Sequence, residues 1–332
     1  MANVPVTELA LRMSKTMKLS AKQRWNRGGA ILALLAFVGL TMAAGGPKWV
    51  TRASLPQALQ LASADQIDGT IYVAGGNSSG TEFLATLYAY SPVTNKWSTL
   101  ASMPAGRYQS EVAGLNGQLY VAGGWNGTLP TNTLFRYDPP SNTWITLAPV
   151  PQLSAAGAAG AIDGKLYVTS PEDGFNGYFN FLDVYDAASN TWTSLAQSSD
   201  AHAAGASGVI DGKLYIAGGV DAPGRITSTT EVYNSTTNSW STLAPISTPV
   251  YGAGSAVSCG KLYVVGGISS GGDVTAVQIY NPANNAWSTF TSLPTATEYL
   301  DAVEVHCSLY AFGGNDASSS WLATNESIKA CQ

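Results

Sequence analysis

The chain has 332 residues, of which 45% are hydrophobic and only 11% are charged, a composition typical of a compact, well-buried fold and not of a disordered chain. The formal net charge is −5 and is unevenly placed, since residues 1–44 carry a net +5 and the remainder therefore −10. An acidic domain without a Lys/Arg cluster repels phosphate backbones, so we expect no nucleic-acid partner.

A basic leader is followed by an apolar segment. Residues 28–46 are 19 residues without a charge, which as a helix just reach across the roughly 30 Å hydrocarbon layer of a bilayer. Because the basic flank stays inside, we expect everything from Pro47 onward to be translocated. Small residues at 43–45 favour a cleaved signal peptide, whereas the length of the segment fits a retained anchor. The sequence therefore predicts an extracytoplasmic protein, secreted or periplasmic after cleavage, or anchored in the membrane by residues 28–46.

The rest of the chain repeats. Five tryptophans are spaced 47 or 48 residues apart, and each follows a tyrosine by seven residues: Tyr90 and Trp97, Tyr137 and Trp144, Tyr185 and Trp192, Tyr233 and Trp240, Tyr280 and Trp287. A second column pairs an aliphatic residue with a tyrosine, usually after Asp-Gly or Asn-Gly and before Gly-Gly. Asp-Gly and Asn-Gly supply the positive φ angles of two-residue hairpin turns. Each unit therefore predicts a four-stranded antiparallel sheet. The third unit alone has Thr169-Ser170 in place of Gly-Gly.

This combination of columns resembles the kelch repeat and extends from Lys48 to about Cys331. The resemblance implies an all-β, six-bladed kelch-type β-propeller. The sixth unit ends before any tryptophan, while Trp49 begins a segment similar to the one at Trp287. We therefore expect the N-terminal strand to complete the last blade and close the ring, which removes exposed sheet edges. The predicted domains are a leader with its apolar segment, 1–46, and a monomeric propeller, 47–332.

There are three cysteines, Cys259, Cys307 and Cys331. An oxidising compartment permits disulfides. Cys307 begins the second strand of the last blade and Cys331 ends its antiparallel third strand, so we expect a bridge between these two. Three unpaired thiols, and a bridge between Cys259 and Cys307, are the alternatives. The sequence has no metal-ligand spacing, and we expect neither a metal nor a cofactor.

Binding by propellers usually falls to loops at one end. In kelch proteins these are the loops between the second and third strands of a blade and the loops between blades. The former contain three aromatic candidates for ligand contact, Trp125, Phe175 and Trp321. The kelch pattern often places an arginine at the mouth of the central channel; here only Arg107 keeps it, and His202 occupies the same column. Their neighbours complete the candidate set: Tyr108, Tyr251, Glu298 and Tyr299. The alternatives are rings that cover the core and polar side chains that are merely solvated.

Two classes of function follow. The first is an extracytoplasmic binding module that recognises a protein or a glycan through one loop face and has no chemistry of its own. The second is an enzyme similar to the kelch sugar mutarotases, using carboxylates at the channel mouth, with Glu111, Asp301 and Glu298 as the candidates. A copper-radical oxidase is excluded, because the chain has only two histidines and His306 lies in the turn column, at the opposite end of the propeller from His202.

Overall fold

The structure is a computed structural model that describes residues 46–331 except 79–81, 173–176 and 223. The leader and nearly all of the predicted signal or anchor segment lie outside these residues, as does Phe175. In the part of the chain that is described, no helix is long and apolar enough to cross a membrane.

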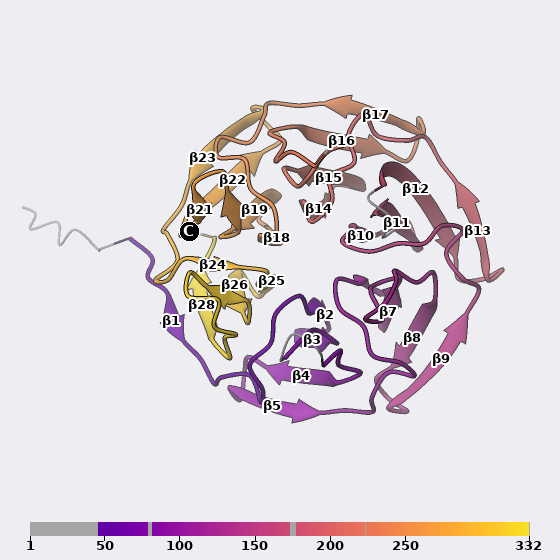
Figure 1. Cartoon of the computed structure of the whole chain (residues 1–332), viewed down its shortest axis with the longest axis horizontal. Helices are drawn as coiled ribbons and strands as arrows, with labels where there is room; N and C mark the ends of the chain where they lie inside the picture. The colour runs from indigo at the N-terminus through magenta and orange to yellow at the C-terminus, as the bar shows by residue number, and fades with distance from the viewer. Residues whose placement is uncertain (1–45, 79–81, 173–176, 223, 332) are drawn as a thin grey trace, which may run out of the picture. The chain divides into compact units, whose positions relative to one another are not determined.

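Six four-stranded antiparallel sheets form the blades of a ring (Figure 1). Blades one to three consist of β2 (Ser63–Ile67), β3 (Thr70–Ala74), β4 (Leu87–Ser91) and β5 (Lys96–Thr99); β6 (Glu111–Leu115), β7 (Gln118–Ala122), β8 (Leu134–Asp138) and β9 (Thr143–Leu147); and β10 (Ala159–Ile162), β11 (Lys165–Glu172), β12 (Tyr178–Asp186) and β13 (Thr191–Ser194). Blades four to six consist of β14 (Ala206–Ile210), β15 (Lys213–Ala217), β16 (Thr230–Asn234) and β17 (Ser239–Thr242); β18 (Gly254–Ser258), β19 (Lys261–Val265), β22 (Val277–Asn281) and β23 (Ala286–Thr289); and β25 (Asp301–Val305), β26 (Ser308–Phe312), β28 (Asn325–Lys329) and β1 (Val50–Thr51). The predicted fold is confirmed.

Two short two-stranded sheets, the hairpin of β20 (Ile268–Ser269) with β21 (Gly272–Asp273) and the pair of β24 (Thr297–Glu298) with β27 (Asn315–Asp316), extend blades five and six. They lie among the loops that join second to third strands and blade to blade. We call the side of the ring that carries these loops the mouth face. The two-residue turns within each blade lie on the opposite face.

The ring closes as predicted, with a strand from the N-terminal end completing blade six. Val50 of β1 pairs with Ser327 of β28. The Trp49 indole Nε1 donates to the carbonyl of Thr291 at 3.1 Å. This is the bond that Trp97 makes to Ala53 at 2.8 Å in blade one, so Trp49 fills the tryptophan column of the blade that lacks its own.

A repeated polar clamp explains why tyrosine and tryptophan recur together. In blade one the Tyr90 hydroxyl donates to Asn95 Oδ1 at 2.7 Å, and the same oxygen accepts the backbone N–H of Ala53 from the preceding segment. Asn95 has a φ of 54°, a left-handed conformation that asparagine tolerates well. The Trp97 indole donates to the carbonyl of the same Ala53, so the asparagine and tryptophan side chains of a blade both bond to the segment that precedes it. Blades two to five repeat the clamp at Asn142, Asn190, Asn238 and Asn285.

The Gly-Gly pairs tie each blade to the loop that follows. A Cβ on Gly75 would lie 2.2 Å from the Arg107 carbonyl oxygen, so no side chain fits there. Gly76 donates its N–H to that same oxygen at 2.8 Å. In blade three, which lacks the Gly-Gly pair, the Thr169 hydroxyl accepts the N–H of Ala158, the residue before β10, and β11 continues to Glu172.

The cysteine prediction is wrong in its pairing. The disulfide joins Cys259 to Cys331, with Cα atoms 6.1 Å apart, while Cys307 is a free, exposed thiol. Cys331 lies beyond the last ladder pair of β28, where the chain is no longer held to β26. It therefore turns toward the hairpin of blade five, where the Ser258 hydroxyl is 3.3 Å from its sulfur. The strand pairing within blade six favoured Cys307 as the partner of Cys331, whereas the contact with blade five brings Cys259 to it.

Candidate functional site at the mouth of the central channel

Six backbone hydrogen bonds form a closed collar around the axis of the ring. One residue from each inter-blade loop accepts from the next and donates to the previous one, with N···O distances of 2.7–3.0 Å. All six have φ between 51° and 60°, the left-handed region in which non-glycine residues are uncommon. The members are Leu61, Gln109, Ala156, Ala204, Gly252 and Tyr299. The collar sets the width of the channel mouth, because each loop is held to both of its neighbours.

Below the collar, the inner strands enclose a cavity of about 410 Å³. The strands that line it are β2, β6, β10, β14, β18 and β25. Small residues dominate, and Ala, Gly and Ser let the strands converge. Pairs of serines also bond across blades: Ser63 Oγ donates to the carbonyl of Ser110 at 2.6 Å, and Ser255 Oγ donates to that of Ser207 at 2.9 Å. The channel is polar and of a size that accommodates a small molecule.

Three carboxyl groups beside the channel serve as links between blades. Asp301 accepts the N–H of Ala64 in blade one, and Asp65 in turn accepts that of Gly114 in blade two. Burial raises the pKa of both aspartates, that of Asp301 to about 8. Each has at least one oxygen engaged by the backbone of the next blade, so these two carboxyls hold inner strands together.

Glu111 continues this series one blade further. Its Oε1 accepts from the Gly157 N–H and the Ser154 hydroxyl, both at 2.9 Å. The residue is only 2% exposed. Burial raises its pKa to about 8, although these hydrogen bonds act to lower it. Its Oε2 has no hydrogen-bond partner among the described residues. Glu111 is also among the residues that line the channel cavity.

A cluster of polar and aromatic side chains gathers at the mouth between blades five and six. We call Tyr251, Asp273, Glu298, Tyr299 and Asn315 the mouth cluster. The two tyrosine rings meet edge to face with centroids 6.2 Å apart, and Tyr299 also lines the cavity. Glu298 pairs with Asn315 across β24 and β27, and Tyr251 bridges to Ile268, which pairs with Asp273.

The electrostatics of the mouth cluster favour protonated groups. Burial, and secondly the charge of Asp273, raise the pKa of Glu298, opposing the hydrogen bond from Asn315. Burial, then the neighbouring Tyr251, hold the pKa of the Tyr299 hydroxyl well above its ordinary range. Two carboxyls within interaction distance of one another share a proton more readily than isolated ones. The cluster thus offers carboxyl, amide and phenol groups for hydrogen bonds, beside two rings.

Two residues predicted at the mouth, Arg107 and His202, are buried, 5% and 3% exposed. The Arg107 guanidinium lies 5.4 Å from the centre of the Phe135 ring and donates to Thr133 Oγ1 at 3.0 Å. Burial lowers its pKa. Both side chains face protein in this structure. Their contact with a ligand stays a prediction.

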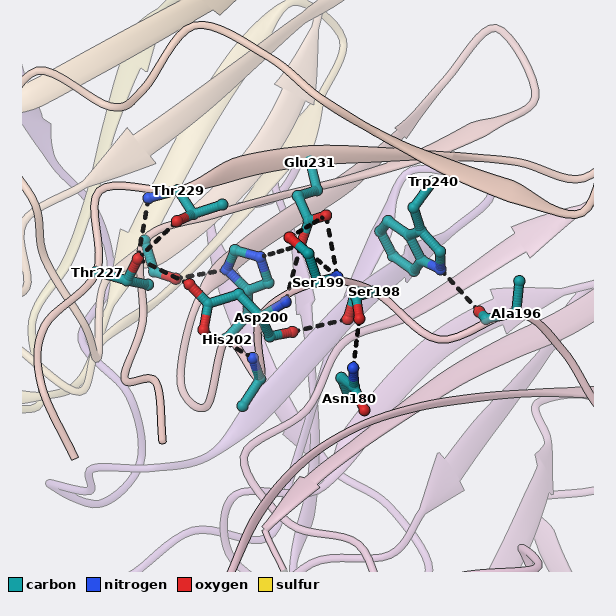
Figure 2. A network of polar contacts seen from close by, with 12 residues as sticks. Asn180, Ala196, Ser198, Ser199, Asp200, His202, Thr227, Thr229, Glu231 and Trp240 are labelled. Atoms are coloured by element: carbon teal, nitrogen blue, oxygen red, sulfur yellow. Dashed lines mark hydrogen bonds and ion pairs between the residues drawn. The ribbon is translucent and has the colours of Figure 1, made fainter. Parts of the chain in front are cut away.

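His202 belongs to a polar network that ties its loop to β16 (Figure 2). Its Nδ1 lies 2.8 Å from the carbonyl of Gly218 and its Nε2 lies 3.1 Å from Glu231 Oε2. Burial opposes ionisation of Glu231, but the hydrogen bonds from His202 and Ser199 outweigh it and lower its pKa. Both ring nitrogens of His202 thus face oxygen atoms of blade four, one from the backbone and one from Glu231.

The remaining aromatic candidates lie in two places, a stack of rings at blade two and a position beside the mouth cluster. Tyr108 lies between Phe83 and Trp125, with ring centroids 5.2 and 6.2 Å away and nearly parallel planes. Trp321 bridges to Asn315 of the mouth cluster, and its indole Nε1 has no hydrogen-bond partner among the described residues. The structure thus groups Tyr251, Glu298, Tyr299 and Trp321 around one seam and Tyr108 with Trp125 at another.

Sequence reasoning missed Asp273, Asn315, Phe83 and Glu231. Asp273 stands in a loop of variable length, where no repeat column marks it. Asn315 follows a Gly-Gly pair as Asn77 does, which is a signal for a shared local role. Glu231 lies next to the Tyr column on β16, and a buried carboxylate needs a partner, which here is His202.

A single group of three or more potential metal ligands occurs in the described part of the chain, and it lies away from the mouth. It consists of the three cysteine sulfurs, within 4.8 Å of one another. Because Cys259 and Cys307 stand in two-residue turns, the group is on the opposite face.

Comparison with known proteins agrees with this architecture. A family model described as the Attractin/LZTR1 beta-propeller matches residues 71–320. Among solved structures, one titled "Structure of YjhT" is similar with a TM-score of 0.72 and 22% sequence identity, covering 82% of this chain and 95% of that one. At that identity the likeness shows the fold alone. A comparison with curated proteins gave no match. The match to the family model covers most of the chain, which therefore belongs to the Attractin/LZTR1 β-propeller family as a kelch-type propeller.

Proposed function

We propose that this propeller is an extracytoplasmic binding module that recognises a glycan through its mouth face. The observation that carries the proposal is the mouth cluster itself, where Tyr299 lines the channel cavity and Glu298 lies beside Asp273. Sugars present hydroxyl groups in several directions and apolar ring faces. Carboxyl, amide and phenol groups beside aromatic rings meet both demands.

A glycan suits the mouth face better than a large protein partner. Protein interfaces have apolar cores with aromatic anchors in well-packed pockets. Of the large hydrophobic side chains that are exposed in the described part of the chain, only Leu129 and Leu153 lie in loops of the mouth face. They stand in blade two and in the loop after it, away from the mouth cluster of blades five and six. A protein ligand is the competing outcome of the same experiment.

Binding to a glycan array by the full chain, followed by calorimetry with the best sugar, tests the proposal. Glu298→Gln replaces the carboxyl with an amide of the same shape, and Tyr299→Phe removes the phenol hydroxyl. We expect each to weaken binding about tenfold or more, since hydrogen bonds to charged or buried groups contribute roughly 1.5–3 kcal/mol. Asp211→Asn, in an exposed turn on the opposite face, is the matched control. Unchanged affinity in both mouth variants would place the ligand elsewhere.

The stack at blade two provides a second arm of this test. Trp125→Ala removes the outer ring of the stack with Tyr108, and Trp321→Ala removes the ring beside Asn315. Under the proposal Trp321→Ala weakens binding and Trp125→Ala does so only for ligands long enough to span both seams. Arg107→Ala is expected to act through stability, because its side chain is buried.

A sugar mutarotase is the second candidate, and the carboxyl pair favours it. Anomer exchange needs one group that donates a proton and one that accepts it. Burial and the charge of Asp273 raise the pKa of Glu298, so Glu298 is the candidate proton donor and the neighbouring Asp273 carboxyl the candidate acceptor. Accelerated interconversion of sugar anomers, followed by NMR, would identify this activity. Loss of that acceleration in Glu298→Gln, with binding retained, would separate catalysis from recognition.

A further inference from the structure

Three sulfur atoms meet on the face opposite to the mouth, at the seam between blades five and six. Cys259 and Cys331 form a disulfide, and Cys307 is a free, exposed thiol. The three Sγ atoms lie within 4.8 Å of one another. A thiolate exchanges with a disulfide by direct attack on one of its sulfurs, so a thiol held this close needs little movement to react.

The backbone presents Cys331 to both of the other cysteines. The N–H of Ala330 donates to the carbonyl of Cys307 at 2.9 Å, which holds the chain end alongside the turn of blade six. On the other side, the Ser258 hydroxyl of blade five lies 3.3 Å from the Cys331 sulfur. Cys259 and Cys307 stand in tight turns with φ of 49° and 60°. Cys331 thus lies between the two turns that carry Cys259 and Cys307.

We propose that these residues form a thiol–disulfide exchange site in which Cys331 alternates between Cys259 and Cys307. The Cys307 thiolate attacks the Sγ of Cys331 and forms a new S–S bond. The bond between Cys331 and Cys259 breaks, and its electron pair leaves on Cys259 as a thiolate. The proton that Cys307 released to solvent is balanced by protonation of Cys259. No net oxidation or reduction occurs, so no external reagent is consumed.

The exchange changes which parts of the ring are covalently joined. The bond from Cys331 to Cys259 links blade six covalently to the β18–β19 hairpin of blade five. A bond from Cys331 to Cys307 lies within blade six and leaves the seam held by non-covalent contacts alone. The mouth cluster spans the same two blades at the other end. The site is independent of the glycan proposal, since its chemistry requires no ligand.

Tryptic mapping of the full chain distinguishes all pairings, because the cysteines fall in three peptides, 226–261, 262–329 and 330–332. Native protein in EDTA is alkylated at once in acid, or first held at about pH 8.5, where thiolates are populated. We expect peptide 330–332 to be linked to 226–261 in the first sample. In the second, it becomes linked partly to 262–329, and the alkyl label moves from Cys307 to Cys259. The plateau is independent of protein concentration, as for exchange within one chain.

The proposal is overturned if label and linkage stay unchanged in the native protein while urea-unfolded chain shuffles in the same buffer. Cys307→Ser is the control and should keep the single linkage under all conditions. Cys259→Ser isolates the second pairing and should form a Cys307–Cys331 disulfide on oxidation with glutathione disulfide. Failure of the folded Cys259→Ser chain to do so also overturns it. Should that variant not fold, the mapping of the native chain decides alone.

Discussion

His202 Nε2 lies 3.1 Å from Glu231 Oε2, and each side chain is only 2% exposed. The pair connects the loop that enters blade four to β16 of that blade. Glu231 also accepts the N–H and hydroxyl of Ser199 in the same loop. A buried charge with several partners stabilises one loop geometry as long as every partner is present.

Removing one member of this pair is expected to be costly. His202→Ala leaves the Glu231 carboxylate buried without its contact to the imidazole, so the free energy of unfolding should fall by about 3 kcal/mol or more. Urea unfolding followed by tryptophan fluorescence measures the change. The control is His306→Asn, in an exposed turn where φ is 50° and asparagine is tolerated. A change of less than about 0.5 kcal/mol in His202→Ala, as at ordinary surface sites, would show that the ion pair contributes little.

Glu111 predicts a pH dependence of stability. Its pKa is raised to about 8 in the folded protein from an ordinary value of 4.5, so the folded state binds more protons than the unfolded state between these values. The contribution of Glu111 to the free energy of unfolding should therefore be highest below about pH 4.5 and should fall as the pH rises toward 8.

Glu111→Gln tests this slope. The amide keeps an acceptor for Gly157 and Ser154 and does not ionise, so the variant should lose part of the decline between about pH 5 and pH 9. One unit of pKa difference corresponds to about 1.4 kcal/mol, and the shift at Glu111 makes the effect measurable by urea titration. Asp163→Asn, in an exposed turn with φ of 50°, is the control. Parallel slopes for Glu111→Gln and the unsubstituted chain would mean that Glu111 ionises normally.

Ring closure depends on Trp49. Trp49→Ala removes packing against the core cluster between blades five and six and the bond to Thr291, and should lower the free energy of unfolding by about 2 kcal/mol. Trp49→Phe keeps most of the packing and loses the bond, so we expect about 1 kcal/mol. Val50→Ala is a suitable control because Val50 is 49% exposed. If the alanine variant at Trp49 unfolds like the control, β1 does not contribute to closure.

The Gly-Gly pairs permit a matched comparison of two glycines. Gly75 and Gly117 have φ of 67° and 74°, so alanine at either costs about 1–2 kcal/mol of backbone strain. Only at Gly75 would the new Cβ also meet a backbone oxygen, at 2.2 Å. Thermal unfolding should show a markedly lower midpoint for Gly75→Ala than for Gly117→Ala. Equal midpoints would mean that the Arg107 loop moves aside freely.

Much of the scaffold could be predicted from the sequence because its determinants are local and recur six times. The Tyr–Trp spacing, the Asp-Gly turns and the placement of Trp49 all follow from contacts inside one blade or between equivalent positions. The site was harder. Tyr251, Glu298 and Tyr299 could be nominated from their column, but Asp273 stands in a loop without a repeat, and the burial of Arg107 and His202 depends on neighbouring loops.

The sequence by itself determined the number of blades, the closing strand and the column of residues from which the channel mouth is built. Only the tertiary structure decided which of those residues face one another: the collar of six hydrogen bonds, the His202–Glu231 pair, and the union of Cys331 with Cys259 and not with Cys307. The formation of strands and turns depends on contacts between residues close in sequence, so it can be predicted from the spacing of residue types. Contacts between blades depend on how six sheets converge around one axis, and that geometry exists only once the ring has closed.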